Sequence, residues 1–388
     1  MADETPERVP FEAEWTHDLQ HCSDPNRVVG GRGAFTAGQA QPMARRELRS
    51  AGRPPATGVQ TERPPVRFSH DPSKEPSYYD VPMLKSPPWK WEIAWYFFLG
   101  GLSSGAYTVG RMAERFGGKE YAEISRTSAY TAMATFVPCP PLLIHDLGDP
   151  KRFHHMLRVL KPTSPMSLGT WAIMGYSGAL TAEVARQWVL AHVPPKKRGA
   201  LLRAGTATAE AIHDVPGIPL ALTVAGYTGV LLSTSANPLW SKNKWLGPLF
   251  SASAIATGAA ATSLALSMFG KRGGREESHA ALEHIDTAAH IAEAVCLGGF
   301  LKEAGEKGNS LTKGSMKGHT AVMAGGLLAS ELLKLIPFRG TLRRITMMFS
   351  TILSLVSGFA LRWAMVHAGH EAANDPRTNR LSSRRADV

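Results

Sequence analysis

The sequence predicts an all-α integral membrane protein with about eight transmembrane helices, arranged as two four-helix bundles, behind a long, mostly irregular hydrophilic N-terminal segment. The chain has 388 residues and a mean hydropathy of −0.13, but its apolar residues are segregated. Residues 1–88 hold about half of the 27 prolines and no long apolar run, so they cannot bury enough surface to fold alone. Beyond residue 88, long uncharged runs follow one another. We therefore expect an N-terminal extension (1–88), a multi-pass membrane domain (89–370) and a polar C-terminal tail (371–388).

The uncharged runs locate the eight predicted spans. The second run contains Pro138, Pro140 and Pro141, which must kink or break its helix. Lys and Arg are more frequent in the loops after the odd-numbered spans, which predicts that these loops are cytoplasmic and that both termini lie outside. The spans are expected at 93–110, 127–145, within 162–182, within 215–241, at 245–270, 279–301, 319–338 and 345–367.

The first span, within residues 89–111, has three unusual features. A carboxylate, Glu92, stands at its mouth, aromatic residues crowd its first turns, and glycine, serine and alanine follow. Glu92 and Tyr96 are four residues apart and therefore share one helix face. One interpretation is the wall of a site for a flat, apolar ligand with a polar head. The other is an aromatic belt above a seam of small residues at which helices pack closely.

The sixth span carries four ionisable residues, Glu283, Asp286, His290 and Glu293. Their spacings of about one helical turn place them on one face. Because a carboxylate facing lipid is costly, this face should look into the bundle, toward Glu331 and Lys334 of the seventh span. These six residues predict a proton path. A polar seam between helices, or an amphipathic helix on the membrane surface, are the alternatives.

The charge and cysteine content exclude some classes of protein. The net charge of +11 is spread over loops and tails between apolar runs, as in membrane proteins, and no nucleic-acid motif is present. Lipid, rather than nucleic acid, is the expected environment. Cys22, Cys139 and Cys296 are far apart, so they cannot form a self-contained iron–sulfur cluster or a cysteine-rich metal site. We expect no bound metal.

Several loop motifs lie on the side of the membrane where Glu92 and Tyr96 enter it. In the 145–155 segment, Asp149-Pro150 indicates a helix start, and Asp146 can pair with Arg152. Ser164 is placed to cap the third span, and Trp240 follows the fourth. Together, the 146–165 and 236–244 loops predict a polar, aromatic-rimmed surface for docking a partner.

Four sequence stretches follow one another along the chain: WEIAWYFFLGGLSSGA, DLGDPKRF, SPMSLGTW and AGYTGVLLSTSANPLW. Their order resembles that in the membrane subunit of polysulfide-reductase-type complexes, the NrfD/PsrC family. The resemblance covers about residues 89–370. It implies a multi-pass subunit of the bacterial or archaeal cytoplasmic (inner) membrane, without haem or an iron–sulfur cluster of its own. Such a subunit exchanges electrons between a quinone (menaquinone or ubiquinone) and a four-cluster ferredoxin-like iron–sulfur subunit. That partner passes them to or from a molybdopterin or multihaem cytochrome catalytic subunit.

The resemblance also implies roles for particular residues of this quinone-dependent oxidoreductase subunit. The active site for the terminal substrate is not expected on this chain. Some relatives carry Asn and His on the first span, where this sequence has Ile93 and Tyr96. The quinone head group is expected near Glu92, Tyr96, His145, Asp146 and Arg152, with Ser103, Ser104 and Tyr227 as further quinone-binding residues.

Two other functions remain open from the sequence. A secondary transporter or ion channel would suit the acidic face of the sixth span and the broken second span, although no inverted repeat is visible. A haem-b membrane anchor needs facing histidine pairs deep in the spans, and His290 is the only histidine we place there. An optical spectrum of the purified protein tests the anchor, because bound haem gives a Soret band.

Overall fold

The computed structural model describes residues 28–29, 34–35, 84–270, 276–337 and 339–384. The chain divides into two compact units, Met1–Gln60 and Thr61–Val388. In the first unit, strands β1 (Val28–Val29) and β2 (Ala34–Phe35) pair antiparallel. The irregular extension predicted for residues 1–88 falls mostly outside the described residues.

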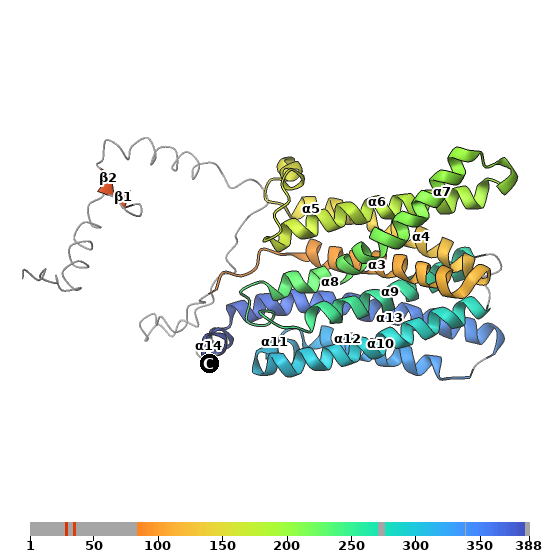
Figure 1. The fold of residues 1–388 in the computed structure, drawn as a ribbon. Coiled ribbons are helices and arrows are strands. Elements are labelled where there is room, and N and C mark those ends of the chain that lie inside the picture. The colour runs from red at the N-terminus through yellow and green to blue at the C-terminus, as the bar shows by residue number, and fades with distance from the viewer. Residues whose placement is uncertain (1–27, 30–33, 36–83, 271–275, 338, 385–388) are drawn as a thin grey trace, which may run out of the picture. The chain divides into compact units, whose positions relative to one another are not determined.

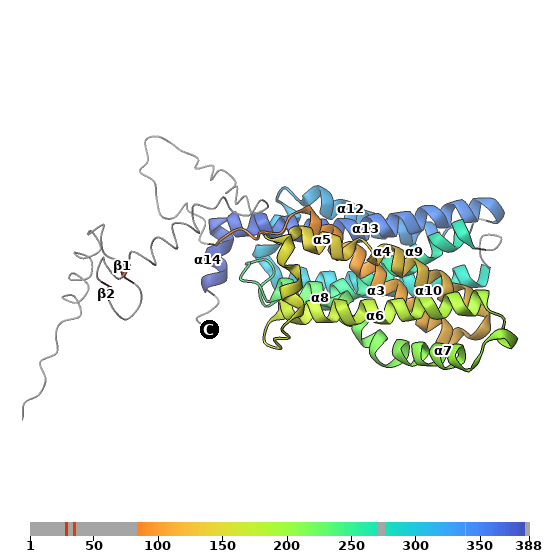
Figure 2. The same cartoon turned by 90° about the horizontal axis from the view of Figure 1, so that it is seen from above.

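The second unit consists of helices that lie side by side along a common long axis (Figures 1 and 2). Chain direction alternates from one long helix to the next, as expected for a multi-pass protein (Figure 1). We call the two ends of this unit the Trp91 end and the Gly117 end, after the two termini of α3. The α-helices are α3 (Trp91–Gly117), α4 (Ala122–Phe136), α5 (Cys139–Asp146), α6 (Pro165–His192), α7 (Ala200–Ile212), α8 (Ile218–Ser233), α9 (Leu246–Phe269), α10 (Glu276–Ala304), α11 (Asn309–Thr312), α12 (Lys317–Lys334), α13 (Gly340–Asn374) and α14 (Pro376–Arg384). Short 3₁₀ segments lie at Gly118–Tyr121, Pro150–Leu157, Pro195–Lys197 and Gly305–Gly308, and a π-helix at His213–Gly217.

Helix α3 is the central element, because it packs against α4, α8, α9 and α13. For reference we divide the helices in chain order into two groups, α3–α8 and α9–α13, which contact each other mainly through α3 with α9 and α8 with α9. The groups meet where α3 crosses α9 at Gly105 and Gly258. A Cβ atom on Gly105 would lie 1.8 Å from the Ala254 carbonyl oxygen, so only glycine permits this approach. The small residues of the first span therefore form a packing seam, as one of the two interpretations predicted.

Each predicted span falls on a helix. The prolines break the second span as expected, since α4 ends at Phe136 and α5 begins at Cys139. Ser164 caps α6, its hydroxyl accepting a hydrogen bond from the Ser167 N–H at 3.5 Å. Among the residues that the structure describes, three segments are long and apolar enough to cross a membrane by length and composition alone: 200–233, Leu246–Phe269 and Gly340–Asn374.

The helices extend beyond the limits predicted for the third and fourth spans. Helix α6 continues to His192, ten residues past the expected limit of 182. The candidate segment 200–233 begins before residue 215, because α7, the π-helix and α8 form one continuous segment. In both cases the prediction excluded charged residues that the fold buries, namely Glu183, Arg186 and His213. The predicted polar tail contains helix α14.

Candidate functional site

At the Trp91 end of α3, the carboxyl group of Glu92 is buried. Its side chain lies in the first turn of α3 and is 4% exposed. Oε1 lies 3.1 Å from Nδ1 of His145, the residue before the end of α5. The second oxygen, Oε2, is buried without a hydrogen-bond partner among the residues that the structure describes. A buried polar atom left unpaired is costly, so it marks a position where a ligand can bind.

Tyr96 lies one turn further along the same face of α3 and is 3% exposed. Within the described part of the chain, its hydroxyl also has no partner. Cys139 of α5 and Tyr227 of α8 are close enough to act on it electrostatically. Glu92 and Tyr96 thus offer one acceptor and one donor, one helical turn apart, so the first can accept a hydrogen bond from a ligand hydroxyl and the second can donate one to a ligand carbonyl oxygen.

Asp146 ends α5, beyond the predicted span 127–145, and completes this polar corner. Burial, together with the nearby Glu92 carboxylate, raises its pKa to about 6. A carboxyl group with such a pKa exchanges protons near neutral pH, which suits a group that passes protons between a buried site and solvent.

An apolar groove of about 570 Å³ opens at the same end, between the start of α6, the second half of α8 and the start of α9. Leu168, Leu222 and Val230 contribute to its wall, and so does Tyr227. The Tyr227 hydroxyl donates a hydrogen bond to the Pro165 carbonyl oxygen at 2.7 Å. The groove is therefore suited to an apolar chain or ring, with Tyr227 between it and Tyr96.

The other residues predicted for this site have local partners. The Ser103 hydroxyl donates to the Ala132 carbonyl at 2.7 Å, and that of Ser104 donates to the Gly101 carbonyl at 2.9 Å. Arg152 does not pair with Asp146. It pairs with Asp149 at 3.1 Å, because the 3₁₀ helix brings residues three apart together, and it is 68% exposed. A direct role for these three residues in ligand binding stays a prediction.

Trp240, expected on the docking surface, is fully buried. Its ring stacks on Trp89 at 5.5 Å, and its indole N–H donates to the Met365 carbonyl oxygen at 3.1 Å. The expectation that Trp240 contacts a partner was wrong, since this side chain anchors the loop to α13. The 150–157 segment, by contrast, is exposed along most of its length.

The predicted face of α10 looks into the helix group, as expected. Lys334 donates a hydrogen bond to Asp286 at 2.7 Å, and His290 Nδ1 lies 2.6 Å from Glu331. Ser354 of α13 joins Asp286 and His290 at 3.2 and 3.0 Å. We call this set, with Thr287, the Asp286 cluster. A surface-lying helix is therefore wrong for 279–301.

The remaining members of the predicted proton path lie at the two ends of this cluster. Glu293 is buried and interacts with Arg362 and Ser253, deeper in the bundle. Glu283 approaches Arg343 at 4.0 Å, at the Gly117 end. A cavity of about 10 Å³ beside Glu283 and Asp286 has room for about one water molecule.

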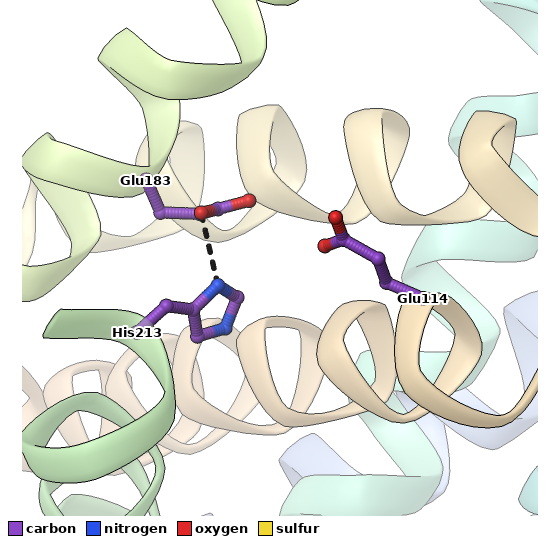
Figure 3. Close-up of side chains that lie close together, drawn as sticks. All are labelled: Glu114, Glu183 and His213. Atoms are coloured by element: carbon purple, nitrogen blue, oxygen red, sulfur yellow. Dashed lines mark ion pairs between the residues drawn. The ribbon is translucent and has the colours of Figure 1, made fainter. Parts of the chain in front are cut away.

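A second buried cluster, which the sequence did not predict, joins α3, α6 and the π-helix. Figure 3 shows Glu183 and His213 pointing toward one another, with Glu114 approaching from α3. His213 Nδ1 lies 2.9 Å from Glu183, and both side chains are almost fully buried. Arg186 donates to Glu183 at 2.7 and 2.9 Å and to Glu114 at 2.6 Å. We call these residues, with Arg111 and Asp214, the Glu183 cluster.

Both clusters contain enough ligand atoms to hold a metal ion. In Glu114, Glu183 and His213 these atoms lie within 4.8 Å of one another, and the same is true of Asp286, His290 and Glu331. In each cluster, however, a protein cation already lies among the carboxylates, Arg186 in the first and Lys334 in the second. A metal ion would have to displace that cation, so both arrangements fit ion-pair networks better than metal centres.

The signal for the Glu183 cluster was present in the sequence. Glu183 and Arg186, like Arg111 and Glu114, are three residues apart and directly continue an apolar run. Such pairs satisfy each other on one helix face and can remain inside a membrane helix. His213 places a second buried histidine in a helical segment. Its Nδ1 lies beside Glu183 at 2.9 Å, whereas His290 Nδ1 lies beside Glu331 at 2.6 Å, so each imidazole is engaged in its own cluster.

Comparison with known proteins agrees with this architecture. The family model described as polysulphide reductase, NrfD, matches residues 81–373. The chain belongs to the NrfD family. This is a family of integral membrane proteins, and the match covers helices α3 to α12 and α13 as far as residue 373.

Three relatives of this NrfD-family chain are similar over about half of its length. The C subunit of selenate reductase from Mesobacillus selenatarsenatis is 26% identical over 51% of this chain and 52% of its own length. The C chain of polysulfide reductase from Wolinella succinogenes is 28% identical, over 54% and 68%. Protein NrfD of Escherichia coli is 26% identical, over 48% and 61%. The match thus spans about half of the first relative and about two thirds of the second.

Proposed function

We propose that this chain is the quinone-reactive membrane subunit of a respiratory oxidoreductase complex. The observation that carries the proposal is the pair of buried, unpaired atoms at the Trp91 end, Glu92 Oε2 and the Tyr96 hydroxyl. An apolar groove lined in part by Tyr227 opens at the same end. Its membership of the NrfD family supports this role, and two relatives are by name subunits of reductases.

The residues fit a quinone head group. A bound quinone accepts or gives up two electrons and two protons, and its two oxygens need hydrogen-bond partners in both redox states. The Tyr96 hydroxyl is placed to donate to one oxygen, and the Glu92–His145 pair to hold the proton of the other. Tyr227 orients the ring at the mouth of the groove, which excludes water from the isoprenoid chain. Asp146 passes protons from His145 to solvent.

The electron partner should dock at the Trp91 end, because a redox partner must lie close to the head group. The 3₁₀ segment Pro150–Leu157 presents Lys151, Arg152 and Phe153 at this end, all exposed. We expect a four-cluster ferredoxin-like iron–sulfur subunit there, with a molybdopterin or multihaem catalytic subunit beyond it. In this proposal eight helical segments cross a prokaryotic cytoplasmic membrane.

Glu92→Gln and Tyr96→Phe test the proposal in the assembled complex. Each change removes one hydrogen-bonding function at constant shape, which typically costs on the order of 1–3 kcal/mol, or roughly 5- to 150-fold in quinol turnover. Glu277→Gln and Tyr130→Phe, at exposed positions, are the matched controls. Turnover is measured with purified quinol at equal amounts of complex. Wild-type turnover in both Glu92→Gln and Tyr96→Phe would reject the assignment.

A further inference from the structure

One face of α3 carries polar side chains from one end of the helix to the other. The spacings of these residues are 3, 4 or 7, so they share a face that looks toward α4, α5, α6 and the π-helix. Hydroxyl and ionisable groups inside a membrane helix are expensive, and a continuous row of them needs an explanation. We call this row, which consists of Glu92, Tyr96, Ser103, Tyr107, Arg111 and Glu114, the α3 stripe.

Cys139 and Tyr176 connect the quinone end of the stripe to its middle. A Cβ atom on Gly100 would lie 3.5 Å from the Tyr96 ring and 3.9 Å from Cys139 Sγ, so these two side chains flank the same point of α3. Cys139 is also an electrostatic neighbour of Tyr176. The Tyr176 and Ser103 hydroxyls lie 2.8 Å apart. The Cys139 sulfur atom therefore lies beside α3 in the interval between Tyr96 and Ser103.

Tyr107 connects the middle of the stripe to the Glu183 cluster. Its ring contacts Tyr176 edge-on, with centroids 5.4 Å apart, and His213 at 4.2 Å. Its hydroxyl is buried and has no partner among the described side and main chains, and the same holds for His213 Nε2. A Cβ atom on Gly217 would lie 2.3 Å from that hydroxyl, so glycine at this position of the π-helix leaves room for it. The rings of Tyr107 and His213 are thus in contact, and each carries a polar atom without a partner among the described residues.

The π-helix explains why His213 reaches this position. The π-helix, His213–Gly217, contains Pro216 and has a wider turn than an α-helix. Side chains in and after it therefore lie on a different face from the one that α7 would have continued. Such bulges occur frequently at functional sites. Beyond His213, Asp214 and Glu210 pair with Arg111, and both carboxylates are about half exposed. The network therefore runs from a buried imidazole to the surface of the helix group at the Gly117 end.

Charged groups surround His213 on three elements. Tyr107, Arg111 and Glu114 face it from α3, Glu183 and Arg186 from α6, and Glu210 and Asp214 from its own segment. Four carboxylates thus stand against two guanidinium groups.

We propose that the α3 stripe, with Cys139, Tyr176, Glu183 and His213, is a proton relay between the quinone site at the Trp91 end and the Gly117 end. This inference rests on the proposed function. Oxidation of one quinol releases two electrons, which leave to the iron–sulfur partner, and two protons. The relay carries protons away from Tyr96, and each hydroxyl, imidazole or carboxyl group regains its starting state by passing its proton on. Arg111 stays protonated throughout and holds the Glu114 and Asp214 carboxylates in place. Quinone reduction uses the same groups in reverse.

Tyr107→Phe is the sharpest test, because a structural role and a relay role predict opposite results. The hydroxyl is buried and unpaired, so its removal should leave stability unchanged or raise it if Tyr107 only packs. If Tyr107 relays protons, turnover should fall by at least about tenfold with KM for quinol unchanged. The complete complex is assayed in liposomes that contain a trapped pH-sensitive dye, with Tyr130→Phe as the matched control. We also expect the dye response per quinol to fall.

The outcomes separate this inference from the proposed function. If wild-type complex oxidises no quinol, the proposed function fails. If wild type turns over quinol and Tyr107→Phe matches it in rate and dye response, the relay is overturned while the proposed function stands. Should Tyr107→Phe fail to assemble, Tyr176→Phe and Ser103→Ala interrupt the same route. Their turnover is expected to fall and to show a larger solvent deuterium isotope effect than wild type, and an unchanged rate and isotope effect in both would overturn the relay.

Discussion

The Glu183 cluster and the Asp286 cluster both lie toward the Gly117 end of the helices, one in each helix group. Each combines carboxylates, a histidine and a protein cation within hydrogen-bonding range. They differ in how completely their groups are paired. In the Asp286 cluster, Asp286, His290, Glu331 and Lys334 all have polar partners. Beside the Glu183 cluster, the Tyr107 hydroxyl and His213 Nε2 have none among the described residues.

This difference separates a structural network from one that is suited to transfer. A buried polar network with every group satisfied rigidifies the helices around it. A buried polar group that is left unpaired has lost its hydrogen bonds to water, which costs free energy. A transient partner such as a proton or a water molecule lowers that cost. On this basis we expect the Asp286 cluster mainly to hold α10, α12 and α13 together, and the Glu183 cluster to take part in proton movement.

The largest expected effect follows from removal of the central cation in either cluster. Arg186→Met leaves Glu183 buried without its bidentate partner, and Lys334→Met leaves Asp286 buried without the cation that donates to its Oδ2. Breaking a buried ion pair in this way typically costs about 3–5 kcal/mol. We expect lower yield and a lower melting temperature of the detergent-solubilised protein for both variants, with the exposed Arg115→Met unchanged. A melting temperature equal to wild type in either variant would show that its cluster is not paired as described.

A smaller effect is expected from His290→Gln, which tests the proton path predicted along α10. The substitution weakens the hydrogen bonds to Glu331 and Ser354. It should lower the free energy of unfolding by about 1–3 kcal/mol, because buried partners are left unpaired. If the Asp286 cluster is a structural seam, the melting temperature falls and proton-coupled turnover per assembled complex stays at the wild-type value. Slow turnover at an unchanged melting temperature, absent in the exposed control His284→Gln, would instead assign the proton path to α10.

The two clusters also show what the sequence can predict. The Asp286 cluster was visible because its residues recur about once per turn on one helix, and that spacing alone implies a shared face. The Glu183 cluster is built from three elements about 70 and 30 residues apart in the chain, so no local spacing connects Glu114, Glu183 and His213. Its charges resemble the ends of apolar runs, which shortened the third and fourth predicted spans.

The polar corner around Glu92 and Tyr96 was partly predictable from the sequence and so lies between these two cases. Glu92 and Tyr96 were recognisable from one helix turn, and the break between α4 and α5 from its prolines. The pairing of Glu92 with His145, and of Arg152 with Asp149 rather than Asp146, depends on how the end of α5 and the following 3₁₀ helix pack. Trp240 looked like a surface anchor, but its position against Trp89 and Met365 is set by contacts with residues far away in the sequence.

The central claim is that the quinone head group binds at the Trp91 end, between α3, α5 and α8. Photolabelling of the assembled complex with an azido-quinone, followed by peptide mass spectrometry, tests it most directly. We predict labels near Glu92, Tyr96, His145 and Tyr227, which excess natural quinol prevents and Tyr96→Phe reduces. Labels confined to α10 and α12, or insensitive to competing quinol, would contradict it.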